Sequence, residues 1–428
     1  MRRDRRFAVA MTAVLGSLAV IAGALVVVGV VKGPALTGSQ VNLRAAEAGA
    51  GQRLVLASDQ ALDETVAPTV TVEPAVPVTV SVQGTAVTVQ LEAALAYDTD
   101  YTVSVRGVAG AVGGGRSDWT ERFSTPDVSD LLVLRHGAGE DEVVSVGARR
   151  DDEVAYRGEG IVAFAGTASD LAIVQRDPST GSDVVTVVPR QGGDPTVLAF
   201  PAAGTVTSLR ASPDGSMLGL TYTQPQTAFT AAGSDLLFTY DLARGGGLPE
   251  LVPDDHGEQI SAVDWTFVPG SAQLLALTPT GRLLRVDAVD AFTGQAVATD
   301  VGAADALRGT LPGAQGVVVD DAGSLSVVTA DALAPVPWRL DGTSPMQVVV
   351  DDQGATLSAS AQGALVLRSA SGETSTVLPA AGDGIAALCS SRNGLYAVVT
   401  TEGGETEVVS LSEGSVLLTT EGTDPSWC

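Results

Sequence analysis

The chain has 428 residues, long enough for two or three domains, and carries 24 Lys and Arg against 50 Asp and Glu, a formal net charge of −26. This charge opposes binding to nucleic acid and to anionic lipid headgroups, since both repel an acidic surface. The chain is too apolar to be disordered, because charged residues make up only 17% of it. Val and Thr are abundant, and their branched side chains favour strands, so we predict an all-β protein. The N-terminal segment adds one predicted membrane helix.

The N-terminal segment predicts the membrane helix. Residues 1–6 hold four Arg and one Asp, and residues 7–31 hold no charged side chain. A helix of that length covers about 37 Å, enough to cross a hydrocarbon core of roughly 30 Å. The arginines keep a basic tip, 1–6, in the cytoplasm, so everything after Lys32 is extracytoplasmic and the protein is a single-pass cell-membrane protein. The alternatives are a cleaved signal peptide and a twin-arginine signal.

Residues 38–127 contain short runs in which apolar and polar residues alternate, the pattern of strands with one buried face. Gly, Pro and Asp separate these runs, as turns require. The pattern predicts an antiparallel β-sandwich. The runs are 52–58, 68–74, 77–84, 86–92, 101–107 and 119–126.

Three motifs in this module resemble the bacterial immunoglobulin-like (Ig-like) modules of surface proteins. They are "LAYDTDYTVSVRG" at 95–107, "RFSTPD" at 122–127 and "VEPAV" at 72–76. The resemblance implies a spacer or adhesive unit and assigns no functional residue. A rigid sandwich placed after the anchor would also hold the next domain away from the membrane.

A repeat occupies residues 128–428. "GEDEVVS" at 139–145 returns as "GETEVVS" at 404–410, and the same glycine-to-strand step recurs between them. The intervals between successive steps are 42, 52, 48, 42, 40 and 41 residues. Seven steps with a period near 42 predict four-stranded propeller blades. The step glycines, called marker glycines below, are Gly139, Gly181, Gly233, Gly281, Gly323, Gly363 and Gly404.

The units between the marker glycines resemble those of TolB-like and WD40-like propellers, in which an inner strand ends in Ser-Pro-Asp-Gly, here at 212–215. The resemblance covers 128–428 and implies a seven-bladed β-propeller. A single strand, 131–137, precedes the first marker glycine, whereas the last repeat already has four strands. The tail "DPSWC" at 424–428 is similar to "AVDWTF" at 262–267, so we predict that it supplies the missing inner strand and closes the ring.

The two cysteines fit this closure. Cys428 follows Trp427 as Thr266 follows Trp265, and Cys389 lies five residues before Gly394, as Thr266 lies five before Ser271. Both cysteines therefore fall at the same level of neighbouring inner strands. In an extracytoplasmic protein we predict a Cys389–Cys428 disulfide, which would stabilise the fold by about 3–4 kcal/mol. Two free thiols are the alternative.

No catalytic signature accompanies this architecture, so the sequence predicts no catalytic, cofactor-binding or metal-ligating residue and no cofactor. No Gly-x-Ser-x-Gly elbow or phosphate-binding loop occurs. His136 and His256 lie in predicted loops without clustered ligands and are expected to be surface residues. Four acidic pairs are expected to solvate turns, with a cation site as the alternative. The pairs are Asp151–Asp152, Asp254–Asp255, Asp320–Asp321 and Asp351–Asp352.

These observations favour a non-enzymatic, membrane-anchored scaffold or binding protein. Its propeller would bind an extracytoplasmic protein, peptide or glycan through one face or the central channel. One alternative is a hydrolase or lyase acting on a cell-surface polysaccharide or peptide, which would need acidic residues converging in the channel. Another is a structural partner of a membrane complex that uses the anchor helix. Propellers serve many functions, so the fold itself does not choose among these.

Overall fold

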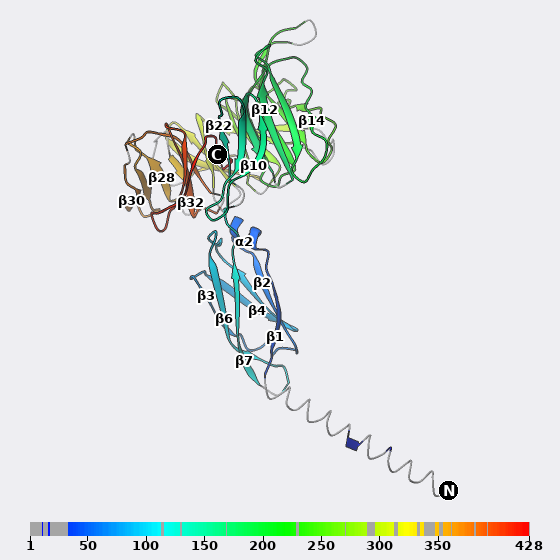
Figure 1. Cartoon of the computed structure of the whole chain (residues 1–428), viewed down its shortest axis with the longest axis vertical. Coiled ribbons are helices and arrows are strands. Elements are labelled where there is room, and N and C mark those ends of the chain that lie inside the picture. The colour runs from blue at the N-terminus through cyan, green and yellow to red at the C-terminus, as the bar shows by residue number, and fades with distance from the viewer. Residues whose placement is uncertain are drawn as a thin grey trace, which may run out of the picture. The chain divides into compact units, whose positions relative to one another are not determined.

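The computed structural model divides the chain into two compact units, Met1–Pro126 and Asp127–Cys428, and each is described by itself (Figure 1). The described residues are 11, 16–17 and 33–428, without 113–114, 129–130, 168, 228–230, 270, 289–295, 312–315, 332–333, 338–346, 351–353, 361, 381, 392 and 428.

The predicted membrane helix, 7–31, lies outside the described residues except for Met11, Gly16 and Ser17. Within the described part of the chain, no helix is long and apolar enough to span a bilayer.

The first unit consists of two antiparallel sheets around one core. One sheet has the order β1-β2-β5-β4 and the other the order β3-β6-β7. The strands are β1 (Leu36–Gln40), β2 (Arg53–Ser58), β3 (Thr69–Glu73), β4 (Val78–Gln83), β5 (Ala86–Leu91), β6 (Asp100–Ala109) and β7 (Arg116–Ser124). Their apolar faces share a buried cluster that includes Leu54, Val89, Val103 and Trp119.

Two elements of this unit were not expected from the sequence. They are β1, which pairs with β2, and the six-residue helix α2 (Leu43–Ala48). The side chain of Asn42 caps α2 by accepting a hydrogen bond from the amide of Ala45 at 3.2 Å. The helix is too short to show an apolar periodicity, which is why the alternation pattern passes over it.

The second unit is a succession of antiparallel sheets, each built from strands consecutive in the chain, an arrangement like that of a β-propeller (Figure 1). The first sheet has three named strands: β8 (Leu132–Arg135), β9 (Asp141–Ser145) and β10 (Glu153–Gly158). The second sheet is β11 (Ile161–Gly166), β12 (Asp170–Arg176), β13 (Asp183–Pro189) and β14 (Thr196–Val197). The third is β15 (Thr205–Ala211), β16 (Met217–Gln224), β17 (Gly233–Asp241) and β18 (Glu250–Leu251).

The remaining sheets each have four strands among the described residues. The fourth is β19 (Asp264–Phe267), β20 (Gln273–Leu277), β21 (Arg282–Asp287) and β22 (Val297–Ala303). The fifth is β23 (Ala306–Thr310), β24 (Gly316–Asp321), β25 (Ser324–Thr329) and β26 (Val336–Pro337). The sixth is β27 (Gln347–Val349), β28 (Thr356–Ala359), β29 (Leu365–Arg368) and β30 (Thr374–Leu378). The seventh is β31 (Ile385–Ser390), β32 (Tyr396–Thr401), β33 (Glu405–Ser410) and β34 (Val416–Glu421).

The seven marker glycines lead into corresponding strands, namely β9, β13, β17, β21, β25, β29 and β33. Six of them are the third strands of four-stranded sheets, and β9 is the middle strand of the three-stranded first sheet. Several marker glycines turn the chain at a positive φ, for example Gly281 at 79° and Gly404 at 82°. A residue with a Cβ rarely adopts this conformation, which explains why glycine marks the repeat.

Hydrophobic cores lie between successive sheets. Trp265 and Phe267 of the fourth sheet, for example, pack in one buried cluster with Met217 and Leu237 of the third. Similar clusters join the first sheet to the second, the second to the third, and so on to the seventh. The first strands β11, β15, β19, β23, β27 and β31 also contact one another in that order. Each sheet therefore buries its faces against its neighbours in the chain.

The C-terminal tail returns to the first sheet. Leu134 of β8 and Thr423 exchange two backbone hydrogen bonds of 2.8 Å. Nearby, the amide of Ser426 donates to the carbonyl of Leu132 at 2.9 Å. The tail thus occupies the free edge of β8, the place that the sequence left for a fourth strand.

The prediction that 424–428 form a strand is wrong in one respect. Thr423 makes an isolated bridge and residues 426–427 form a turn, while Cys428 lies outside the described residues. Asp424 has a φ of 51°, which is outside the strand region, and Pro425 has no amide proton to donate. Both residues interrupt pairing, so the edge is covered by a bent segment.

Candidate binding site

One hollow in the second unit, called the central hollow, lies where the first strands of five successive sheets come together. Its volume is about 270 Å³. Residues from β15, β19, β23, β27 and β31 line it, together with Trp427 of the tail. Its charged and amide side chains are Arg210, Asp264, Arg308 and Gln347. Segments far apart in the sequence thus converge on one small space.

The alternation of β19 explains how polar groups reach this hollow. Asp264 and Thr266 are half-buried and line it, whereas Trp265 and Phe267 are buried in the core between sheets. Side chains of a strand point to opposite faces in turn, so one short strand supplies both lining and packing. The indole nitrogen of Trp265 donates to the hydroxyl of Ser208 at 2.6 Å, which fixes the ring.

The guanidinium of Arg210 lies over that ring, with its central carbon 5.4 Å from the centroid of Trp265. Its nearest carboxylate oxygen, on Asp264, is 3.8 Å away, which is beyond hydrogen-bond distance. Among the described residues, no acceptor lies within hydrogen-bond distance of the guanidinium. About a third of the side chain, 37%, remains exposed, which leaves donors available to the hollow. Burial lowers the pKa of Arg210, yet an arginine stays charged at neutral pH.

Asp264 is the carboxylate among the lining residues. Burial raises the pKa of Asp264, and this effect exceeds the opposing attraction of Arg210 and the hydrogen bond from the amide of Trp265. That amide donates to Asp264 at 2.8 Å. The carboxylate is therefore poorly compensated, because the charge beside it is too distant for a direct hydrogen bond.

Arg308, the second arginine of the hollow, differs from Arg210 in that a carboxylate accepts hydrogen bonds from it. Its Nε and Nη2 atoms donate to one carboxylate oxygen of Asp320, at 3.0 and 2.6 Å. The other oxygen of Asp320 accepts from the amide of Gly323 at 2.8 Å. Asp320 is buried, so the pair is a satisfied internal ion pair that neutralises Arg308.

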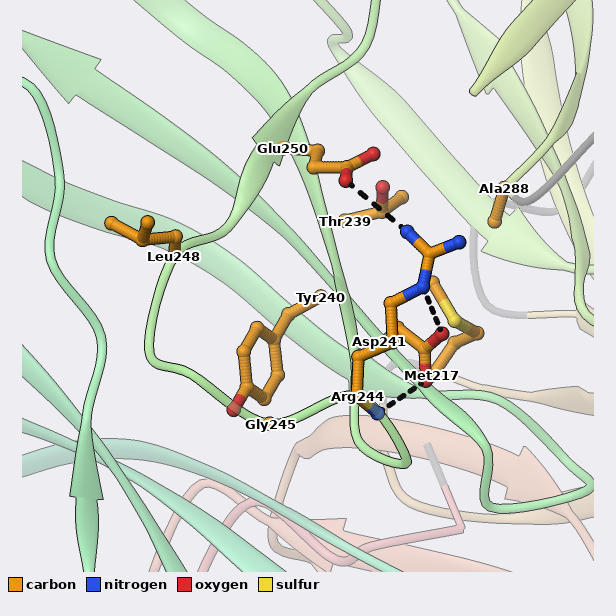
Figure 2. A pocket seen from close by; sticks show the side chains of 9 residues that line it. All are labelled: Met217, Thr239, Tyr240, Asp241, Arg244, Gly245, Leu248, Glu250 and Ala288. Carbon is orange, nitrogen blue, oxygen red and sulfur yellow. Dashed lines mark hydrogen bonds and ion pairs between the residues drawn. The ribbon is translucent and has the colours of Figure 1, made fainter. Parts of the chain in front are cut away.

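A second, smaller pocket, called the outer pocket, lies between β16, β17 and the loop before β18. Its volume is about 100 Å³. Figure 2 shows Arg244 between Asp241 and Glu250, with ion-pair distances of 3.4 and 3.6 Å. The carboxylates of Asp241 and Glu250 thus offset the positive charge of Arg244, so the outer pocket offers little attraction to an anionic ligand.

The predicted acidic pairs are partly engaged by arginines. Arg282 contacts Asp254, Asp255 and Asp300 at 3.4, 2.7 and 3.0 Å. Asp320 is held by Arg308, and Asp152 pairs with Arg135. The pair Asp351–Asp352 lies outside the described residues.

No cluster of three metal-ligating side chains occurs in the described part of the chain. His136 lies 3.0 Å from Asp141 and is largely exposed, as is His256. Both histidines are therefore surface residues. Of the described acidic pairs, Asp152, Asp254, Asp255 and Asp320 take part in ion pairs.

Cys389 lies on β31 and lines the central hollow with Trp427. Its predicted partner, Cys428, lies outside the described residues, so the Cys389–Cys428 disulfide stays a prediction. The sequence argument had placed Cys389 and Thr266 at the same level of their inner strands. Both residues do line the hollow.

Sequence reasoning missed Arg210, although a signal for it existed. Arg210 lies five residues before Gly215 of the Ser-Pro-Asp-Gly turn. Thr266 and Cys389 have the same spacing to their own turns, and all three line the hollow. The partner Asp264 and the supporting Trp265 belong to another sheet, which no local motif reveals.

Comparison with known proteins assigns no family. No protein-family model matches the chain, and neither does any curated protein. Among solved structures, the chain is similar to dihydro-heme d1 dehydrogenase NirN in complex with DHE, at 14% identity over 70% of this chain and 74% of that one, with a TM-score of 0.46. It is also similar to the C-terminal WD40 domain of Sif2, at 13% identity over 67% and 83% of the two chains, with a TM-score of 0.40.

A third similar structure is a protein of unknown function from Bacteroides thetaiotaomicron, at 11% identity over 86% of this chain and 95% of that one, with a TM-score of 0.38. Likenesses at these values carry no argument about ligand or activity. The all-β, propeller-like description therefore rests on the sheets themselves.

Proposed function

We propose that this chain is a non-enzymatic, membrane-anchored binding or scaffold protein. Residues 7–31 would anchor it, an Ig-like sandwich would act as a stalk, and a closed seven-bladed propeller would bind its ligand. The observation that carries the proposal is the central hollow, where five first strands and the tail contribute polar side chains to one small space. Ligand sites of this kind are concave and few per protein.

Closure of the ring is part of the proposal. The tail pairs with β8, and Arg135 of β8 donates to the carbonyl of Glu421 at 2.9 Å. These contacts join the seventh sheet to the first and support a ring in which the C-terminal segment completes the first blade.

The binding role is tested by crosslinking on cells. A photo-crosslinking phenylalanine derivative replaces Thr310, which lines the hollow, or Leu248, which is exposed at the outer pocket. We expect a defined adduct from position 310 and none from position 248. No adduct from position 310, or equal adducts from both positions, would contradict binding in the hollow.

The anchor is tested separately by membrane fractionation of the full chain and of a variant lacking 7–31. The proposal expects the full chain to sediment with membranes and the shortened chain to be released. A mature protein whose mass lacks the N-terminal segment would instead support a cleaved signal peptide.

Asp264 keeps a hydrolase or lyase as the alternative function. Burial raises the pKa of Asp264, as is useful for a general acid. Hydrolysis of a glycosidic bond, however, normally uses two carboxyl groups roughly 5–9.5 Å apart, and Asp264 is the single carboxylate among the described residues that line the hollow. Turnover of a polysaccharide or peptide that Asp264→Asn abolishes would favour the enzyme.

A further inference from the structure

We propose that the central hollow binds a ligand through a single carboxylate group, which Arg210 receives. This inference rests on the proposed binding function and names the chemical class of the ligand. The geometry around Arg210 carries it. Its guanidinium carbon lies over the ring of Trp265, 5.4 Å from the centroid, its nearest carboxylate oxygen is 3.8 Å away, and no acceptor among the described residues is within hydrogen-bond distance.

The contact with Trp265 holds the guanidinium of Arg210 in place. The cation–π contact with the ring uses no N–H donor in a hydrogen bond, so the donors of the guanidinium stay available to another acceptor. The ring itself is fixed by the hydrogen bond to Ser208 and by burial in the core. Arg210 is therefore held against one rigid surface, with a planar fork suited to a carboxylate.

The charge balance of the hollow favours a monoanion. Arg308 is neutralised by the buried Asp320, so it adds little net attraction. This leaves Arg210 as the cation that a ligand can pair, and Asp264 as a competing negative charge. One carboxylate matches one guanidinium fork, whereas a doubly charged phosphate would leave a charge unpaired in a half-buried space.

The size of the hollow and the rest of its lining describe the remainder of the ligand. A volume of about 270 Å³ admits a small molecule or the end of a longer chain. Trp427 and Leu307 offer apolar contact, and Thr266 and Thr310 offer hydroxyl groups. Both an acyl amino acid, which resembles a peptide C-terminus, and a uronic acid share the required carboxylate.

The test is isothermal titration of the full-length chain, purified in a non-ionic detergent, with matched acids and neutral counterparts. Benzoylglycine and its primary amide represent a chain end, and galacturonic acid and galactose represent a sugar. We expect at least one acid to bind and its neutral counterpart to bind about tenfold more weakly or not at all. Which acid binds identifies the source of the carboxylate.

Variants then assign the contact to Arg210. Arg210→Gln should weaken binding of the acid about tenfold, and Arg210→Lys should weaken it less, since charge is kept and the fork is lost. Asp264→Asn should strengthen binding about two- to fivefold, because a competing negative charge disappears. The matched control, Arg244→Gln in the outer pocket, should leave binding unchanged.

Several outcomes would overturn the proposal. They are equal binding of acid and amide, unchanged binding in Arg210→Gln, or no binding of either acid at about 10 mM, where even millimolar dissociation constants give a signal. If crosslinks still form from position 310 in any of these cases, the hollow is a binding site for another class of ligand. If the crosslinks are also missing, the proposed function fails as well.

Discussion

The central hollow and the outer pocket each contain arginine, but their charge balances differ. In the outer pocket one arginine, Arg244, lies between two carboxylates, those of Asp241 and Glu250. In the central hollow, Arg308 is paired with Asp320, whereas Arg210 faces Asp264 at 3.8 Å. The comparison teaches that pairing and burial, rather than the presence of an arginine, decide whether a pocket can receive an anion.

The difference is notable because the whole chain is acidic, with a net charge of −26. The outer pocket has one positive and two negative side chains, so its net charge is negative, as is that of the whole chain. In the hollow, Arg308 is neutralised by Asp320 behind it, while Arg210 has only Asp264, at 3.8 Å, as its nearest described carboxylate. An anion repelled by most of the chain would therefore find local compensation in the hollow.

The largest effect is expected from Trp265→Ala, which removes the surface that supports Arg210. Trp265 is 1% exposed and packs edge-on against Phe267, with ring centroids 5.7 Å apart. Truncation should lower the free energy of unfolding by about 3–5 kcal/mol, measured by denaturant titration. Leu248→Ala is the control, since Leu248 is 71% exposed at the outer pocket and should change stability by less than about 0.5 kcal/mol. Similar losses of unfolding free energy in Trp265→Ala and Leu248→Ala would contradict a rigid, buried support beneath Arg210.

The wall of the hollow provides the next test, through Cys389. If the predicted link to Cys428 exists, Cys428→Ser should lower the free energy of unfolding by about 3–4 kcal/mol. The mass of the intact chain should also rise by about 2 Da on reduction, because two thiols form. An unchanged mass would show two free thiols and would leave the tail held by its hydrogen bonds to β8.

Asp320→Ala tests whether Arg308 is neutralised as described. The substitution leaves a guanidinium facing the hollow without its buried partner, so it should cost about 3 kcal/mol of unfolding free energy. Glu250→Ala breaks a surface pair in the outer pocket and should cost less than about 1 kcal/mol. If Asp320→Ala cost no more than its control, the contrast between the buried and the exposed pair would be wrong.

The smallest effect is expected from Asp264→Asn. Because burial raises the pKa of Asp264, the folded chain holds this proton more tightly than the unfolded chain does. Ionised Asp264 therefore costs stability at neutral pH, and the cost disappears as the pH falls through its raised pKa toward the usual value of 3.8. The substitution should raise Tm by about 1–2 °C at pH 7 and by nothing in acid, as calorimetry across pH can measure. A Tm that falls at pH 7 would contradict this account of Asp264.

Much of the architecture followed from the sequence because it depends on local patterns. The marker glycines predicted the strands that follow them, since several sit at turns with positive φ, a conformation that glycine adopts more readily than any residue with a Cβ. The short helix α2 and the bend at Asp424 and Pro425 were missed because a single capping or breaking residue decides each. Such features leave no periodicity.

The site was harder to predict for a physical reason. Arg210 and Asp264 are 54 positions apart, on different sheets, and their contact depends on how those sheets pack. Whether Arg210 is paired depends on neighbours that the chain brings together only on folding. The five-residue spacing to Gly215 predicts that Arg210 faces the hollow. It does not reveal that Arg210 has no carboxylate within hydrogen-bond distance among the described residues.

The most direct test of the account is a side-chain NMR titration of the arginine Nε–Hε groups in the full-length chain. Arg210→Gln, Arg308→Gln and Arg244→Gln assign the three signals. On addition of the bound acid, the account predicts a saturable shift of the Arg210 signal, while those of Arg308 and Arg244 stay unchanged. Equal shifts of all three signals, or a saturable shift at Arg244 alone, would contradict the central claim that Arg210 is the cation left free for a ligand.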